Sequence, residues 1–409
     1  MRIVYVTSTM PYGAKEPFLV PEVAELRRCG HRVTIVPMRP QGSVVHDDAR
    51  PFLGETLGRP IVSVEIVRVA LAEMLSSPPQ TLRLLRLLLR SRTPRILAKN
   101  LAVLPKGLWL GRRMRALGPE HLHAHWASTS STMAMIAAEV SGVPWSFTAH
   151  RWDITENNLL EIKCARACFT RVISERGART LMALVAAPPR GLRVMRVGIE
   201  TSTGAPTAAD AGRRPIRVVA IADLVEVKGH RHLLDALRLL ERRGRPVLVD
   251  LAGDGPLRPE IERRVTEAGL WGCVTMLGTV PHARLLDDLR ALRWDAAVLP
   301  SAVTVDAEEG LPVSLVEAMD AGVPVISTRV GAIPELLDGG AGMLVDGGDA
   351  PALADGLELL ASDPLLRARL AAEGRRRVRT EFDVARVAAA LVREFESCSA
   401  GASSTAGPV

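Results

Sequence analysis

The chain has 409 residues, of which 47% are hydrophobic and 24% are charged, and this balance is typical of a globular protein of about two domains. Its formal net charge is +7, so we expect an anionic partner such as a nucleotide or a lipid headgroup. Aromatic residues make up only 3% of the chain, which argues against a stacking surface for single-stranded nucleic acid. We therefore expect no nucleic-acid partner.

Cysteine usage and the N-terminal residues indicate a cytoplasmic protein. The five cysteines are odd in number and lie mostly in apolar runs, which disfavours a disulfide framework. The opening MRIVYVTSTMPYG reads as a short strand that ends in Pro-Tyr-Gly, and not as a signal peptide. No apolar run reaches the length of about 18 residues that a membrane span needs. We expect a cytoplasmic location, with peripheral contact at the inner face of the membrane as a further expectation.

The first half of the chain alternates short β-branched runs with amphipathic stretches. Strands are predicted at 3–7, 32–37, 61–67, 121–125, 145–149, 169–174 and 192–197. A helix is predicted between the first two, over PFLVPEVAELRRCG, where Gly30 closes it. Near-continuous apolar strands that alternate with helices predict a parallel sheet covered on both faces.

Residues 74–119 form an unusual segment, because they include no acidic residue and many arginines and lysines. Leucines fill the gaps at helical spacing, as in TLRLLRLLLR. A basic amphipathic helix of this kind can lie on an anionic membrane surface, and we expect such contact through 81–115. The alternative is a pair of helices packed on the sheet with solvated arginines.

The second half repeats the pattern of the first after a linker at 199–215 that is rich in Ala, Gly, Thr and Pro. Its strands are predicted at 216–222, 247–253, 273–278, 295–300, 323–329 and 342–346. The fold class is therefore α/β, with two Rossmann-like doubly wound domains that bind ligands at the carboxyl ends of their strands. The predicted organisation is an N-terminal domain, a C-terminal domain, a helix that crosses back to the first domain and a disordered tail, at 1–205, 206–380, 381–398 and 399–409.

Two glutamates eight positions apart, Glu309 and Glu317, flank an apolar run that starts at Pro312. Proline is well placed in a first helical turn, where its missing N–H costs nothing. The free N–H groups of 311–314 and the helix dipole then form an anion site, to which Ser314 adds a hydroxyl. From these residues alone, two glutamates near a helix start are also compatible with a solvated pair that the dipole favours.

The surrounding motifs favour an active site, because EEGLPVSLVEAMDAGVPVISTRVGAIPELL resembles the E-x7-E signature of family-4 retaining glycosyltransferases, which have the GT-B fold. LVEVKGHRHLLDAL (224–237) and LAGDGPLRPEIE (251–262) resemble the Lys-Gly segment and the Gly-Asp-Gly-Pro turn of that family. In the first half, TMPYGAKEPFLVPEVAELRRCGHRV, HAHWAS and SFTAH resemble its first loop and two strand ends. The resemblance extends over about residues 1–390, and it implies two domains that face each other across a cleft.

The resemblance assigns the nucleotide-sugar donor to the second domain. Glu309 would contact the transferred sugar at the reacting centre, and Glu317 would bind the ribose hydroxyls. Lys228 would neutralise the diphosphate, whose negative charge grows as the nucleotide leaves. The other donor-binding residues implied are Gly253, Gly310, Leu311, Pro312, Val313 and Ser314.

In the first domain, the resemblance assigns an acceptor or phosphate loop with Gly13, Lys15 and Glu16, where Gly13 allows close approach of the backbone. His150, at the end of SFTAH, corresponds to an active-site histidine near the sugar, and His125 is a strand-end histidine in the substrate cleft. The alternation of HLHAH places His121, His123 and His125 on one strand face, an arrangement that is compatible with a zinc site. A fourth ligand is not evident, so we expect no metal.

The sequence departs from the family pattern at Ala222-Asp223, where the family usually has Gly-Arg. An arginine there would bind the diphosphate, whereas an aspartate would repel it, so Lys228, Arg329 and the helix N–H groups would have to suffice. We expect retention of configuration by front-face attack, with neither a metal nor any other cofactor.

The sequence therefore predicts a retaining glycosyltransferase that moves a hexose or N-acetylhexosamine from a nucleotide-diphosphate sugar, most simply a UDP sugar. The acceptor would be a hydroxyl of a glycan, of a lipid-linked intermediate or of a natural product such as an aminocyclitol. The alternatives are a non-catalytic binding or partner protein and a nucleotide-sugar epimerase or phosphorylase on the same fold. The E-x7-E signature disfavours the other enzymes, and Asp223 is the reason for considering a binding protein.

Overall fold

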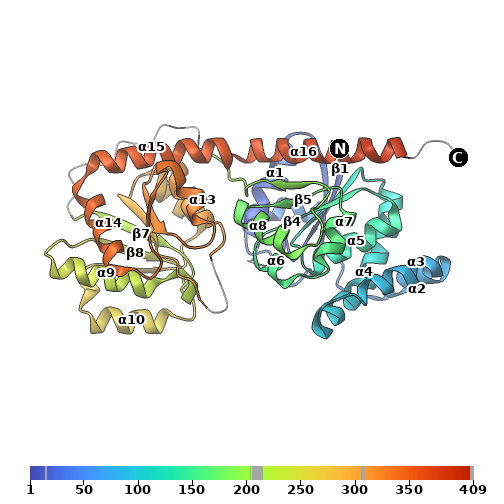
Figure 1. Cartoon of the computed structure of the whole chain (residues 1–409), viewed down its shortest axis with the longest axis horizontal. Coiled ribbons are helices and arrows are strands. Elements are labelled where there is room, and N and C mark those ends of the chain that lie inside the picture. Colours follow the sequence, from blue (N-terminus) through green and yellow to red (C-terminus); the bar gives the residue numbers. More distant parts are fainter. Residues whose placement is uncertain (14–15, 203, 205–214, 305–308, 406–409) are drawn as a thin grey trace. The chain divides into compact units, whose positions relative to one another are not determined.

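The structure is a computed structural model that describes residues 1–13, 16–202, 204, 215–304 and 309–405 (Figure 1). The chain divides into two compact units. The N-terminal unit contains Met1–Gly198 and Val384–Val409, and the C-terminal unit contains Ile199–Asp383. Each unit has its own sheet and its own hydrophobic core.

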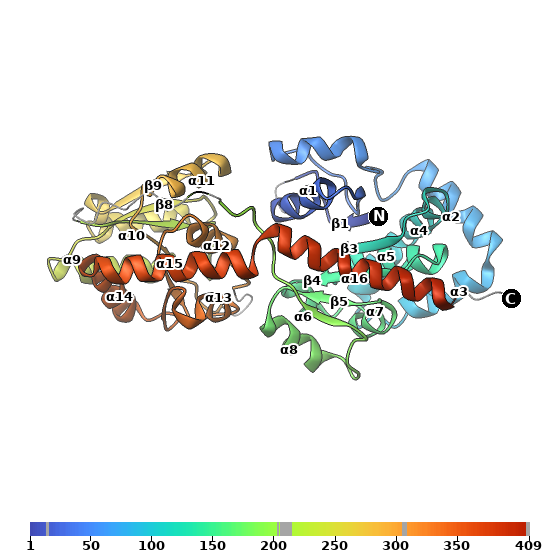
Figure 2. The same ribbon diagram turned by 90° about the horizontal axis from the view of Figure 1, so that it is seen from above.

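The sheet of the N-terminal unit has six parallel strands in the order β2-β1-β3-β4-β5-β6. Four of them, β1, β3, β4 and β5, are labelled in Figure 2. The strands are β1 (Arg2–Thr7), β2 (Arg32–Pro37), β3 (His121–His125), β4 (Trp145–Ala149), β5 (Thr170–Val172) and β6 (Leu192–Val194). In the register of β1 and β3, Tyr5 lies opposite His123. Because all strands are parallel, the residues that follow β1, β3 and β4 lie along one edge of the sheet.

Helices cover both faces of this sheet. The helices of this unit are α1 (Val20–Arg28), α2 (Val64–Ser76), α3 (Pro78–Leu88), α4 (Pro94–Leu117), α5 (Thr129–Ser141), α6 (Trp152–Glu156), α7 (Leu160–Arg166), α8 (Glu175–Leu184) and α16 (Val384–Thr405), with the 3-10 turns η1 (Pro17–Leu19) and η2 (Asp47–Glu55). Alternate residues of β1 pack on different cores: Val4 joins the core of α4 and α5, whereas Tyr5 joins the core of α1 and α16. Both faces of the sheet are therefore buried.

One predicted strand, 61–67, is wrong. Residues 64–67 of this run are the start of helix α2. The Oγ atom of Ser63 caps the helix by accepting a hydrogen bond from Ile66 N at 3.3 Å. Ile66 and Ala70 pack into the core at helical spacing, while Val62 and Val64 are exposed. The β-branched composition favoured a strand, and the serine cap together with one buried helical face outweighed it.

The C-terminal unit also has six parallel strands, in the order β12-β11-β10-β7-β8-β9. The strands are β7 (Arg217–Ile221), β8 (Leu248–Ala252), β9 (Val274–Gly278), β10 (Ala296–Leu299), β11 (Val325–Thr328) and β12 (Met343–Val345). The helices are α9 (His230–Arg242), α10 (Arg258–Glu267), α11 (His282–Arg290), α12 (Val313–Asp320), α13 (Ile333–Leu337), α14 (Ala350–Ser362) and α15 (Pro364–Glu381), with the 3-10 turns η3 (Glu226–Lys228), η4 (Leu270–Gly272) and η5 (Asp338–Gly340).

The last helix, α16, belongs to the N-terminal unit. Its residues Ala388, Leu391 and Phe395 are buried in the same cluster as Tyr5. Helix α16 extends to Thr405, so residues 399–405 are helical where the disordered tail 399–409 was predicted. Residues 406–409 lie outside the described residues. Among the described helices, none is both long and apolar enough to span a membrane.

Candidate functional site

The E-x7-E segment comprises the residues that precede α12 and the first turns of that helix. Glu309 is 8% exposed, and the backbone then passes through Gly310 and Leu311 to Pro312, which caps α12. The first N–H groups of a helix have no acceptor within the helix, and those of Val313 and Ser314 have no acceptor among the residues that the structure describes, an arrangement that suits an anion. Residues 305–308 of the preceding loop are outside the described residues.

The structure brings Glu309 and Lys228 together. The Nζ atom of Lys228, at the end of η3, donates to Oε2 of Glu309 at 2.8 Å, and the hydroxyl of Ser301 donates to the same oxygen at 2.9 Å. The Lys228 side chain is 21% exposed. An ammonium group has three donors, so Lys228 can hold Glu309 and still offer N–H groups to a phosphate.

Two glycines allow the close backbone contacts on which this pair depends. Gly331 has φ = 60°, and a Cβ atom there would lie 1.8 Å from the carbonyl oxygen of Glu309. Gly229 has φ = 67°, and a Cβ atom there would lie 1.9 Å from the carbonyl oxygen of Pro300. Any side chain at either position would displace the backbone of the site.

We expect Gly331→Ala to destabilise the C-terminal unit by more than about 2 kcal/mol, because it adds a backbone clash to the cost of a left-handed residue. Gly269→Ala is the matched control, since Gly269 has φ = 71° but nothing lies within 4 Å of its added Cβ atom. The control should lose only about 1 kcal/mol. Urea unfolding of both variants measures the difference, and equal losses would contradict a tight contact at Glu309.

Glu317 lies on α12, and its Oε1 atom is 2.7 Å from Nε2 of His282 on α11. The Glu317 side chain is 12% exposed and that of His282 is 56% exposed. The imidazole thus holds one carboxylate oxygen, and the other has no hydrogen bond within the described residues. Sequence reasoning did not single out His282, since 35 residues separate it from Glu317 and no motif marks it.

Gly253 has a structural role in the described fold. Its φ is 154°, and a Cβ atom there would lie 2.0 Å from the carbonyl oxygen of Ala222. This contact packs the end of β8 against the residues that follow β7. Asp223 is exposed, and Nε of Arg329 lies 3.5 Å from Oδ1 of Asp346.

In the N-terminal unit, Glu16 organises the loop after β1. Its carboxylate is buried and accepts hydrogen bonds from the N–H groups of Ser8, Thr9 and Met10 at 3.1, 2.6 and 2.9 Å. It also accepts the indole N–H of Trp126 at 2.5 Å. Glu16 therefore shapes the loop with both oxygens.

Gly13 and Lys15 are the other two residues predicted in that loop. Gly13 has φ = 72°, and its N–H donates to the carbonyl oxygen of Ser43 at 3.0 Å. Lys15 lies outside the described residues.

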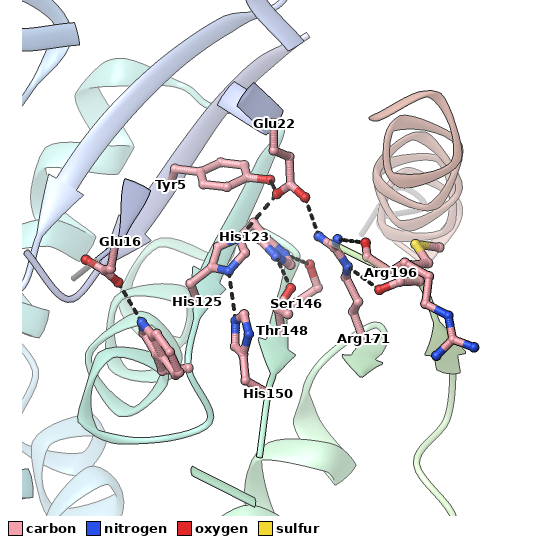
Figure 3. Close-up of polar contacts among 12 residues, drawn as sticks. Tyr5, Glu16, Glu22, His123, His125, Ser146, Thr148, His150, Arg171 and Arg196 are labelled. Atoms are coloured by element: carbon pink, nitrogen blue, oxygen red, sulfur yellow. Dashed lines mark hydrogen bonds and ion pairs between the residues drawn. The ribbon is translucent and has the colours of Figure 1, made fainter. Parts of the chain in front are cut away.

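His125 and His150, at the ends of β3 and β4, are neighbours (Figure 3). Nδ1 of His125 lies 3.4 Å from Nε2 of His150, and Nε2 of His125 lies 3.2 Å from Oε1 of Glu22. Both histidines are buried. Three residues from α1, β3 and the end of β4 therefore form one hydrogen-bonded chain.

The Glu22 carboxylate at the inner end of this chain is held as an anion. Arg171 Nη1 donates to its Oε2 at 2.6 Å, and the Tyr5 hydroxyl donates to Oε1 at 2.7 Å (Figure 3). Burial acts to raise the pKa of Glu22, but the charge of Arg171 and the bonds from His125 and Tyr5 hold that pKa well below its usual range. Burial and the charge of Glu22 raise the pKa of Tyr5 well above its usual value, so the hydroxyl keeps its proton.

This anchor fixes one proton position of the chain. A carboxylate only accepts, so His125 carries a proton on Nε2. Burial, and after it the charge of His125, lowers the pKa of His150 well below its usual value, which keeps the His150 ring neutral. A neutral imidazole has one donor and one acceptor nitrogen, and Nδ1 of His150 is the ring nitrogen that does not face His125.

The other two histidines of β3 bind hydroxyl groups. His123 contacts Ser146 Oγ at 2.7 Å and Thr148 Oγ1 at 2.8 Å, and His121 contacts the same Ser146 Oγ at 2.7 Å. Both nitrogens of His123 are therefore occupied by hydroxyls of the neighbouring strand.

Sequence reasoning missed Glu22 and His230. Glu22 sits in an ordinary helical pattern, and its partner Arg171 is 149 residues away. His230 is buried beside Lys228, and burial and that charge lower the pKa of His230 to about 4. A histidine directly after the Lys-Gly pair was the available signal.

The two six-stranded parallel sheets, each with helices on both faces, define a GT-B fold. The Anabaena protein HepE, solved in complex with UDP, superposes with a TM-score of 0.72 at 16% identity and covers 97% of this chain and 100% of its own. This confirms the predicted fold class.

The family comparison matches a segment that lies within the C-terminal unit. Residues 209–377 match the family model described as glycosyl transferases group 1, which confirms the predicted resemblance for this segment. The amylovoran biosynthesis glycosyltransferase AmsK of Erwinia amylovora is 33% identical over 201 residues, 48% of each chain. The alpha-D-kanosaminyltransferase of Streptomyces kanamyceticus is 33% identical over 159 residues, 39% of each chain. The matches thus span less than half the length of these relatives.

Proposed function

We propose that the protein is a retaining glycosyltransferase that uses a nucleotide-diphosphate sugar. The observation that carries the proposal is the Lys228–Glu309 ion pair at the start of α12, within the segment that matches the group 1 glycosyltransferase model. A buried carboxylate, an ammonium group and free helix N–H groups together suit a sugar linked to a diphosphate.

Each donor contact has a residue of suitable chemistry. The N–H groups of 313 and 314 and the ammonium of Lys228 stabilise the diphosphate as it leaves. Glu309 contacts the transferred sugar, and Glu317 accepts from ribose hydroxyls with the oxygen that His282 leaves free. The phosphate oxygen that departs takes the proton of the attacking hydroxyl, so the new bond forms on the same face and the configuration is retained. No resident metal or other cofactor is part of this proposal.

The donor proposed is a UDP-linked hexose or N-acetylhexosamine, and UDP is the nucleotide bound to HepE, which has the same fold. The acceptor hydroxyl belongs to a glycan, a lipid-linked intermediate or an aminocyclitol-type natural product. The names of AmsK and of the kanosaminyltransferase place one relative in polysaccharide biosynthesis and describe the other as the transferase of an amino sugar. In the N-terminal unit, His150 accepts a hydrogen bond from a substrate hydroxyl.

Hydrolysis of the donor without an acceptor tests the proposal. The protein is incubated with UDP-, GDP- and ADP-glucose and with UDP-N-acetylglucosamine, with and without EDTA, and the released nucleotide is quantified. We expect slow release from one donor, unaffected by EDTA, and NMR of the first-formed sugar should show the α-anomer of the donor. No turnover of any donor would favour the non-catalytic binding protein instead, and an inverted anomer would contradict retention.

A cytoplasmic protein that acts on lipid-linked acceptors needs contact with the inner face of the membrane, and we propose that α3 and its flanks provide it. Leu82 and Leu89 are exposed between exposed arginines at 83, 86, 90, 92 and 95. Apolar side chains among cations suit an anionic interface. The neighbouring α2 adds a further exposed apolar row of Val64, Val67, Leu71 and Leu75.

We expect sedimentation with vesicles that contain phosphatidylglycerol but not with pure phosphatidylcholine vesicles, and we expect salt to release the protein. Arg83→Glu/Arg86→Glu should reduce binding at least about tenfold, since each cation near the surface is worth about 1 kcal/mol. Arg238→Glu/Arg242→Glu, which makes the same charge change on the exposed face of α9, is the matched control. Equal binding of the two variants would count against this surface.

A further inference from the structure

A stack of aromatic rings lies beside His150 in the N-terminal unit. Trp152, at the start of α6, is 48% exposed, and its ring stacks on that of Trp126 with centroids 5.6 Å apart and planes at 28°. Trp126 in turn lies 4.3 Å from the His150 ring. The stack therefore runs from a solvent-facing indole to the imidazole at the end of β4.

The inner ring of the stack is fixed in place. Trp126 has φ = 73°, a left-handed conformation that costs a non-glycine residue energy. Its indole N–H is held by Glu16 at 2.5 Å, and Phe18 packs edge-on against it at 5.9 Å. A strained tryptophan that is held by a buried carboxylate gives Trp152 a rigid support.

The backbone that carries Trp152 is fixed as well. The buried Asp153 carboxylate accepts the N–H groups of Arg151 at 2.8 Å and of His150 at 3.0 Å. It also accepts the N–H of Ala127, next to Trp126, at 2.7 Å. One side chain thus couples the strand ends from which both tryptophans project.

Hydrogen-bonding groups lie next to the stack. Nδ1 of His150 is the ring nitrogen that does not face His125, and Arg151, the chain neighbour of Trp152, has a buried Nη1 donor without an acceptor within the described part of the chain. Ligands of parallel α/β sheets bind at the carboxyl ends of the strands, which is where β3 and β4 place these groups.

We propose that Trp152 is the platform on which the acceptor binds, and that the acceptor is a six-membered polyhydroxylated ring, a pyranose or a cyclitol. Such a ring presents a face of C–H groups that packs on an indole, while its rim of hydroxyls bonds to His150 and Arg151. An acyclic polyol with the same hydroxyls has no such face. The inference rests on the proposed function, because it names the acceptor of that reaction.

Saturation-transfer NMR of the full chain tests the platform without relying on turnover. The probes are methyl α-D-glucopyranoside, methyl α-D-mannopyranoside and myo-inositol, with sorbitol as the acyclic control. Trp152→Ala is compared with Trp271→Ala, because Trp271 is 50% exposed in the C-terminal unit. Urea unfolding of both variants checks that each is folded.

We expect at least one ring probe to receive saturation from the wild type and from Trp271→Ala, and sorbitol to receive little. Trp152→Ala should bind that probe roughly fivefold to tenfold more weakly, since the apolar contact area is lost. Equal binding by Trp152→Ala and the wild type, or no binding of any ring probe to the wild type, would overturn the platform. Donor hydrolysis that persists in Trp152→Ala would then show that only this inference, and not the proposed function, has failed.

Discussion

Glu309→Gln is expected to lower donor hydrolysis and transfer by about a thousandfold or more. The amide keeps the size of the buried side chain but removes the negative charge that pairs with Lys228 at 2.8 Å and that, in the proposed mechanism, faces the sugar. Because Lys228 is then free of its carboxylate partner, the affinity for the product UDP should stay the same or rise. A fall in rate without a fall in nucleotide affinity separates a catalytic role from misfolding.

The matched control is Glu226→Gln. Glu226 lies on η3, as Lys228 does, but its side chain is 64% exposed and pairs only loosely with Arg231 at 3.6 Å. We expect this control to keep wild-type activity. Nucleotide release and UDP titration calorimetry measure the two quantities. A Glu309→Gln protein with more than a tenth of wild-type turnover would remove Glu309 from the catalytic centre.

The second large expected effect is acid sensitivity of the N-terminal unit. Burial lowers the pKa of His121 to about 3, and burial together with the charge of His125 lowers the pKa of His123 and of His150 well below the usual value. Below about pH 6.5 the unfolded chain therefore binds protons that the folded chain does not. The contribution of these histidines to the free energy of unfolding is fully present above that pH, and it decreases as the pH falls toward the pKa values of the folded state.

Each such histidine contributes up to about 1.4 kcal/mol per pH unit, so the free energy of unfolding should fall by about 3–4 kcal/mol between pH 7.5 and 5.5. Tryptophan fluorescence in urea follows the unfolding at each pH. The test variant is His121→Phe, because His121 already stacks with Phe395 at 4.4 Å and its Nδ1 atom has no partner within the described residues. This variant should show about one third less pH dependence, and a wild type that is equally stable at both pH values would contradict the account.

Most of the fold could be predicted from the sequence, because a buried parallel strand needs a short apolar run and such runs recur through both halves of the chain. The failures have local causes. At 61–67 the β-branched residues from Val64 onward belong to a helix whose start is fixed by the Ser63 cap. A single capping serine is a weaker signal in the sequence than a run of β-branched residues, so a strand was predicted. At 399–405 the small residues of the predicted tail continue the helix that Phe395 fixes to the core.

The candidate site was less predictable than the fold. Motifs pointed to Glu309 and Lys228, but not to their direct contact, which depends on a close approach permitted by Gly331. No sequence motif marked Glu22, because its partners Tyr5 and Arg171 come from strands that are far apart in the sequence. Charge pairing within a core is a property of the folded sheet and not of sequence spacing.

Binding of a nucleotide-diphosphate sugar to the C-terminal unit at Lys228 can be measured by a thermal-shift titration with UDP, GDP and ADP sugars. We predict that at least one donor raises the melting temperature of the wild type by about 5–10 °C at a hundredfold excess over its dissociation constant. The same donor should have little effect on Lys228→Gln. A wild type that no nucleotide sugar stabilises, or an equal shift for Lys228→Gln, would contradict donor binding at Lys228.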